Sequence, residues 1–129
     1  MKPNGIAVAG VLALVAILGA AQTIDPKERH PYLDVSIKNL TKELLYDSAF
    51  AFGKSEFEAG ALSPGGTKRY LDWEGPVGTN AVVRWRDSKQ GRKERTISVS
   101  EVYDRTAPGE LIFSITTSNV MVKFEIKKQ

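Results

Sequence analysis

Apolar and polar residues alternate along most of the chain after residue 32. The segment from Leu33 to Lys38 places Leu33, Val35 and Ile37 on one face, and the segment from Val120 to Ile126 alternates in the same way. A period of two residues indicates half-buried β-strands. We therefore predict eight strands, over residues 33–38, 48–52, 57–61, 67–73, 81–87, 96–99, 111–115 and 120–126.

Turn signals separate these strands about every 8–12 residues, which is typical of an antiparallel sandwich or small barrel. The clearest turn is Ser63-Pro64-Gly65-Gly66, because proline presets φ and glycine permits positive φ. The stretch from Leu40 to Tyr46 could instead form a single helical turn. The sequence thus predicts an all-β fold, a single antiparallel β-sandwich of about seven or eight strands over residues 33–129.

The first 21 residues differ from the rest. Lys2 precedes a run from Ile6 to Ala21 that contains no polar side chain and ends in small residues. This pattern is typical of an export signal, and cleavage after Ala21 would fit it. The run is near the lower length limit for a membrane span, so an uncleaved anchor helix is the alternative. Either reading predicts an exported protein, periplasmic or extracellular if cleaved and membrane-anchored if not.

Residues 22–32 are polar, contain Pro26 and Pro31 and show no period, so we expect a polar tether. The chain contains no cysteine, which excludes disulfides and thiol chemistry. Its single histidine, His30, falls in this tether, where we expect it to be solvated and without the rigid support that a catalytic or metal-binding imidazole needs. The sequence indicates no cofactor and no metal site.

Positive charge is concentrated between residues 84 and 95, where six basic residues accompany only Asp87 and Glu94. If this segment is a hairpin, its tip and one face form a basic protrusion that could contact an anionic surface or an acidic partner. The alternative is that the long cations protect an edge strand. The basic residues are Arg84, Arg86, Lys89, Arg92, Lys93 and Arg95.

Two aromatic residues are predicted to lie in different environments. Trp85 shares a face with Val83 in its strand, so we expect it in the core. Tyr103 falls in the longest irregular segment, residues 101–109, and is expected to be exposed as part of a second contact surface.

Carboxylates two residues apart, Glu56 with Glu58 and Asp72 with Glu74, share a strand face and could serve general acid–base chemistry. A solvated strand face shows the same spacing. With no nucleophile and base in a recognisable pattern, we expect no enzymatic activity. A carbohydrate- or cell-wall-acting enzyme is the least favoured alternative.

Two turn motifs carry a resemblance to a known family. A strand runs into Asn39-Leu40-Thr41, and Gly60-x-Leu62-x-Pro64-Gly65-Gly66 leads into a later strand. Over residues 33–87 the chain resembles the immunoglobulin-like modules of exported bacterial proteins. The resemblance implies a spacer or interaction domain with no catalytic residue. The cysteine pair of antibody domains is missing here, so Trp85 matches their buried tryptophan by position alone.

These observations predict a small exported binding module at the cell envelope, with an unidentified envelope protein or an anionic surface as its partner. A structural subunit of an envelope assembly, using exposed strand edges, is the alternative. Nucleic acid is not an expected partner, because the aromatic residue of the basic segment is expected to point inward and offers no stacking platform. The sequence does not specify the oligomeric state.

Overall fold

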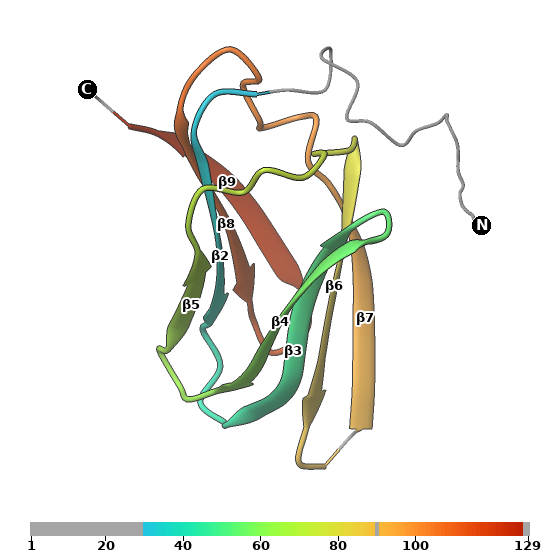
Figure 1. The fold of residues 1–129 in the computed structure, drawn as a ribbon. Coiled ribbons are helices and arrows are strands. Elements are labelled where there is room, and N and C mark those ends of the chain that lie inside the picture. The colour runs from blue at the N-terminus through green and yellow to red at the C-terminus, as the bar shows by residue number, and fades with distance from the viewer. Residues whose placement is uncertain (1–29, 90, 128–129) are drawn as a thin grey trace, which may run out of the picture.

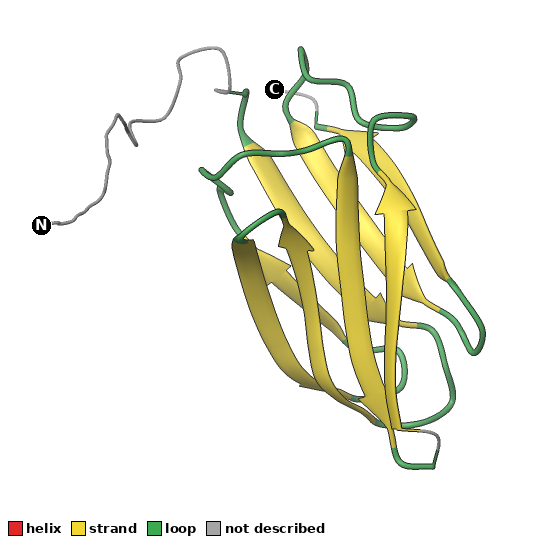
Figure 2. Cartoon of the chain, turned by 90° about the vertical axis from the view of Figure 1, so that its right-hand side faces the viewer, coloured by secondary structure: helices red, strands yellow, loops and turns green. Residues whose placement is uncertain are grey.

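A computed structural model describes residues 30–89 and 91–127, and this part of the chain is all-β (Figures 1 and 2). The described residues include no helix that could cross a membrane. The predicted signal or anchor at residues 1–21, and residues 22–29 of the tether, lie outside them. The strands are β2 (Leu33–Asn39), β3 (Leu45–Phe52), β4 (Ser55–Leu62), β5 (Thr67–Tyr70), β6 (Asn80–Asp87), β7 (Gly91–Ser98), β8 (Gly109–Ile115) and β9 (Val120–Ile126).

The strands form two four-stranded sheets, in the orders β5-β2-β8-β9 and β4-β3-β6-β7. The sheets face one another across a shared hydrophobic core (Figure 1). The prediction of a purely antiparallel fold was wrong at one place, because β2 and β8 pair in parallel over seven residues. Alternation specifies which side chains share a face, but not which strands become neighbours.

The core is built from the residues that alternation placed inward. Val35 and Phe113 of the first sheet meet Phe50 and Val83 of the second, all four at 0% exposure. The Phe50 ring lies 5.3–5.8 Å, between centroids, from four other aromatic rings. These belong to Phe52, Phe57, Trp73 and Phe113. Trp85 is also buried, as predicted.

Asn39, at the end of β2, ties the two sheets together at one end of the sandwich. Its buried side-chain amide donates to the carbonyl of Leu62 in β4, at 2.9 Å, and its Oδ1 accepts the backbone N–H of Thr41. Its backbone exchanges hydrogen bonds with Gly65 and Gly66 in the turn before β5. The side chain's donor and acceptor are both satisfied, as burial requires.

Three strand boundaries differ from the prediction by three residues or more. Residues 40–44 form bends rather than a helical turn, and β3 begins at Leu45. A bulge within β3, where Asp47 has a φ of 50°, breaks the period and hid the start of this strand. β5 ends at Tyr70, just before Asp72 with a φ of 56°. β7 begins five residues before the predicted strand.

Candidate functional site

The outward face of the β5-β2-β8-β9 sheet brings polar side chains from all four strands into rows. Each strand contributes one residue to the central row, in the order Arg69 from β5, Ser36 from β2, Ile112 from β8 and Lys123 from β9. The row toward the end of β2 contains Thr67, Lys38, Ser114 and Met121. The row toward its start contains Asp34, Glu110 and Glu125.

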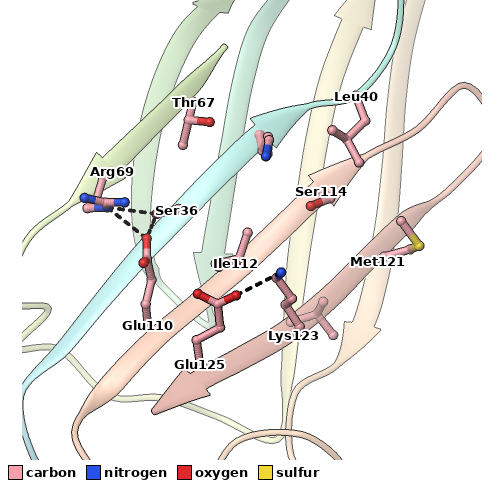
Figure 3. Close-up of a pocket in the computed structure, with 12 residues that line it drawn as sticks. Ser36, Leu40, Thr67, Arg69, Glu110, Ile112, Ser114, Met121, Lys123 and Glu125 are labelled. Atoms are coloured by element: carbon pink, nitrogen blue, oxygen red, sulfur yellow. Dashed lines mark hydrogen bonds and ion pairs between the residues drawn. The ribbon is translucent and has the colours of Figure 1, made fainter. Parts of the chain in front are cut away.

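Glu110 is a buried carboxylate on this outward face, with a side chain only 10% exposed. Its Oε2 accepts a hydrogen bond from the Ser36 hydroxyl and another from Nε of Arg69, at 2.8 Å. Arg69 is itself half exposed and covers the pair from β5 (Figure 3). Among the described residues no hydrogen bond reaches Glu110 Oε1, so this acceptor is available to another molecule.

A hollow of about 530 Å³ lies over these residues. Its lining mixes apolar Leu40, Ile112 and Met121 with charges of both signs, and Lys123 pairs with Glu125 at 2.9 Å (Figure 3). Lys38 has no ion-pair partner among the described residues. The hollow therefore offers an apolar centre, a free cation and a free carboxylate oxygen.

The prediction that β2 has one solvated face was wrong. Asp34 and Ser36, the polar residues of its outward face, are each 1% exposed. Asp34 Oδ2 pairs with the ammonium of Lys127, and Asp34 Oδ1 accepts the backbone N–H of Asp72 at 3.0 Å. Ser36 is covered by the Glu110–Arg69 pair. Polar atoms can be buried here because each of these side chains has partners.

The contacts of Asp34 change how it titrates. Burial alone raises the pKa of Asp34, but hydrogen bonds from Lys127, the Asp72 backbone and Tyr32 together lower this pKa below its ordinary value. The same hydrogen bond with Asp34 raises the pKa of Lys127. Asp34 is thus ionised in the folded state to a lower pH than in the unfolded chain.

The substitution Asp34→Asn is expected to lower the free energy of unfolding at pH 7 by about 1–3 kcal/mol, since a hydrogen-bonded charge pair is lost. A depressed folded-state pKa stabilises the protein above the ordinary pKa of about 3.9 and ceases to do so as pH falls through the folded value. The difference between the two proteins should therefore shrink below about pH 4. Urea denaturation between pH 2 and 7 measures it.

Asp47→Asn provides the control, because Asp47 is exposed and its ion pair with Arg86 is solvated. We expect this variant to change stability by less than about 0.5 kcal/mol. A difference between wild type and Asp34→Asn that stays constant down to pH 2 would contradict the argument.

The predicted basic residues lie on the other sheet, where carboxylates from neighbouring strands offset their charge. Arg84 pairs with Glu56 and, at 3.9 Å, with Glu58. Arg86 pairs with Asp47 at 3.0 Å and lies over the Tyr46 ring. The sequence count between residues 84 and 95 therefore overstates the local positive charge, because the compensating acids come from β3 and β4.

The hairpin also divides its cations between two faces. Arg92 lies directly opposite Arg86 on the outward face, whereas Lys93 and Arg95 lie opposite Trp85 and Val83, on the core side. Lys93 pairs with Asp87 at 3.5 Å, and the Arg95 guanidinium lies 5.9 Å from the centroid of the Trp85 ring. Lys89, Arg92 and Arg95 are the exposed cations of this segment without an ion pair among the described residues, and Arg95 donates to the backbone carbonyls of Glu94 and Ser118.

A second hollow, of about 390 Å³, lies beside the bulge of β3. Three predicted residues, Arg84, Arg86 and Arg92, line it with Asp47 and Glu58. Ser48 also lines it, and its hydroxyl is buried without a hydrogen-bond partner in the described part of the chain. Glu58 and Asp47 already form ion pairs with Arg84 and Arg86, so among these three arginines only Arg92 has no ion pair in the described part of the chain.

The prediction that Tyr103 is exposed was wrong. Residues 100–108 are irregular, as expected, but the loop folds back onto the sandwich and Tyr103 is only 7% exposed. Its ring meets Phe124 of β9 edge-on at 5.2 Å, with the Arg105 guanidinium over it at 5.4 Å. Burial raises the pKa of Tyr103. Tyr103 is therefore part of the core and not of a contact surface.

The other candidate groups form no shared site. Glu56 and Glu58 both contact Arg84. His30 was expected to be solvated but is half-buried, with Nε2 3.0 Å from the Gly75 carbonyl oxygen. Over residues 30–89 and 91–127, no three histidine, aspartate or glutamate residues cluster in a way that could hold a metal ion.

Sequence reasoning missed Ser36, Arg69 and Glu110, although part of the signal was present. Glu110 has the same parity as Ser114 in β8, so both belong to an outward face. Ser36 and Glu110 are 74 residues apart, and only the parallel pairing of β2 with β8 brings them together.

Comparison with known proteins places this chain in no family. No family model matches it, and no curated protein matches it. Among solved structures, it is similar to a protein from Eubacterium rectale determined by NMR, with a TM-score of 0.49 and 14% sequence identity. That likeness covers 84% of this chain and 97% of the other.

Proposed function

We propose that this chain is a small exported interaction module, without catalytic activity of its own, that binds a partner polypeptide at the cell envelope. The observation that carries the proposal is the hollow over Glu110, whose Oε1 lacks a partner among the described residues. This oxygen is open to solvent, because the fully buried side-chain atoms without a partner in the described part of the chain are Ser48 Oγ and the Tyr103 hydroxyl. A ligand that donates a hydrogen bond can therefore replace water at Glu110 Oε1.

The lining of the hollow favours a polypeptide as the ligand. Apolar side chains at the centre with charged residues around them are the arrangement found at protein interfaces, where methionine and arginine are enriched. Met121 and Arg69 fit that arrangement. None of the lining residues is aromatic, whereas sugar rings usually stack on aromatic side chains. A protein segment with a basic or hydroxyl side chain therefore suits this site better than a glycan.

Absence of catalysis is proposed from the chemistry of the same hollow. The Ser36 hydroxyl donates to Glu110, but the guanidinium of Arg69 shares that carboxylate oxygen. Because Arg69 already engages this oxygen, it is not free to act as the base that a serine nucleophile requires. The chain's one imidazole, on His30, contacts Gly75 instead.

We also propose that the sandwich is related to the immunoglobulin-like modules that its sequence resembles. The two motifs behind the resemblance contact one another, since Asn39 exchanges backbone hydrogen bonds with the turn at Gly65 and Gly66. This contact supports the proposal but does not identify a ligand.

Site-specific photocrosslinking in the host tests the function. A photoreactive phenylalanine analogue at Met121 or Thr67, in the hollow, is expected to yield adducts with another envelope protein. The same analogue at Lys54, in the exposed β3–β4 turn, is the matched control and should yield none. Mass spectra of the adducts also show whether the mature chain begins at Gln22, as cleavage after Ala21 requires.

A third position separates the two candidate surfaces. Adducts only from Lys89, at the tip of the β6–β7 hairpin, would move the contact to the basic segment and refute the hollow as the binding site. No adduct from any position would refute the interaction module. If the hollow binds such a segment, Ile112→Lys, which adds a competing cation at the apolar centre of the hollow, should abolish the Thr67 adduct while the variant's thermal unfolding stays cooperative.

A further inference from the structure

β9 is the edge strand of its sheet with the least protection against pairing. In the described sheets, β9 lies at the end of the order β5-β2-β8-β9. Its Met121 is 53% exposed and its Ile126 is 60% exposed. By contrast, the edge strand β7 carries four consecutive charged residues, 92–95, which discourage pairing with another strand. β9 carries only Lys123 and Glu125.

Hydrogen bonds at both ends of β9 show which backbone groups face the open edge. The N–H of Lys127 donates to the Pro108 carbonyl at 3.0 Å, and the N–H of Thr116 donates to the Asn119 carbonyl at 2.8 Å. In an antiparallel pair, residues alternate between bonding to the neighbour and pointing away from it. Residues 121, 123 and 125 therefore bond to β8, and residues 122, 124 and 126 direct their N–H and C=O groups outward.

These outward groups restrict how a second β9 could pair with the first. An antiparallel, two-fold symmetric pair must place outward residues opposite outward residues. A two-fold axis at Lys123 would place the two copies of Lys123 face to face, and an axis at Glu125 would do the same for Glu125. Like charges directly opposite one another are unfavourable.

An axis at Phe124 meets every requirement. It places Lys123 of one copy opposite Glu125 of the other, twice, by symmetry. On the core side it places Val122 opposite Ile126 and the two Phe124 residues opposite one another. Phe124 and Val122 are only half-buried within one copy, so this pairing covers apolar area that a single chain leaves partly exposed.

We propose that β9 pairs with β9 of a second copy of this chain, antiparallel about Phe124, to form one continuous eight-stranded sheet. Charge complementarity, backbone direction and apolar pairing all select the same register. This inference does not rest on the proposed function, because the purified protein alone can show it, although Lys123 and Glu125 also line the hollow.

Engineered cysteines test the register, and the chain's lack of native cysteine makes the result unambiguous. Hydrogen-bonded antiparallel pairs have Cα atoms about 5.5 Å apart, within the range of about 4.4–6.8 Å that disulfides span. Under mild oxidant, Phe124→Cys is expected to form a disulfide-linked dimer. Val122→Cys combined with Ile126→Cys should form one too, whereas Ile126→Cys alone should not.

Sedimentation analysis tests the pairing without disulfides, on the protein as its host produces it. We expect a monomer–dimer equilibrium, weakened about tenfold by Lys123→Glu, because two attractive cross-strand pairs become repulsive. The charge swap that combines Lys123→Glu with Glu125→Lys should restore dimerisation, since each copy again opposes unlike charges.

Three outcomes would overturn the proposal. The first is a wild-type protein that stays monomeric at millimolar concentration, as it would if another segment of the same chain covered β9. The second is efficient cross-linking by Ile126→Cys alone, which indicates a different register. The third is a dimer that Lys123→Glu does not weaken, which places the interface elsewhere.

Discussion

The substitution Phe50→Ala is expected to lower the free energy of unfolding by about 3–5 kcal/mol, the usual cost of removing a buried aromatic side chain. Phe50 is fully buried, and its ring contacts aromatic rings from both sheets, including Phe52 of its own strand and Phe113 of β8. No neighbour can move into the cavity without leaving its own contacts. A domain of this size has only about 5–15 kcal/mol of stability in total.

Phe57→Ala makes the same chemical change at the rim of the cluster and serves as the control. Phe57 is half-buried on β4 and packs against Phe50 and Tyr70. Because solvent and side chains can partly fill the space, we expect a loss about half as large. Urea denaturation of the three proteins measures both effects. Equal losses at the two positions would show that Phe50 is not the centre of the core.

The second large effect is expected at Gly109, the first residue of β8. A Cβ atom there would lie 2.4 Å from the Glu125 carbonyl oxygen and 2.5 Å from the Phe124 ring. The first of these atoms belongs to the backbone and can move only if β9 shifts. Gly109→Ala should therefore lower the free energy of unfolding by about 1–3 kcal/mol through overpacking.

Gly78→Ala controls for the loss of a glycine. A Cβ at Gly78 would have its nearest neighbour, the Asn80 carbonyl oxygen, at an ordinary 3.5 Å. This variant should be neutral or slightly stabilising, because alanine restricts the unfolded chain. Thermal unfolding under identical conditions compares the two. A Gly109→Ala protein as stable as Gly78→Ala would mean that β8 and β9 are less tightly paired than the structure shows.

The sequence predicted the strands where regular alternation persists, and the bulge in β3 hid the start of that strand although Leu45 lies in the core. β6 alternates cleanly, so its inward residues, Trp85 among them, were identified correctly. The start of β7 was missed because residues 92–95 are charged on both faces. An edge strand near the end of a hairpin can expose both of its faces, so hydrophobic alternation disappears there although the backbone still pairs with β6.

The candidate site was less predictable than the fold. Predicting a basic surface requires only a local count of charges, but its real potential depends on Asp47, Glu56 and Glu58, which come from other strands. Predicting the hollow over Glu110 requires knowing that β2 and β8 are parallel neighbours. That pairing joins the first and seventh described strands, and hydrophobic alternation gives no information about such distant partners.

The contact between Asp34 and Lys127 closes the domain on itself. It joins the first described strand to the residue that follows the last. Figure 1 shows the start of β2 and the end of β9 at the same end of the sandwich. A chain that enters and leaves at one end can be attached to neighbouring sequence there without disturbing its turns at the other. The start of β2 and the end of β9 thus lie at one end of the sandwich, and the β6–β7 and β8–β9 hairpins turn at the opposite end.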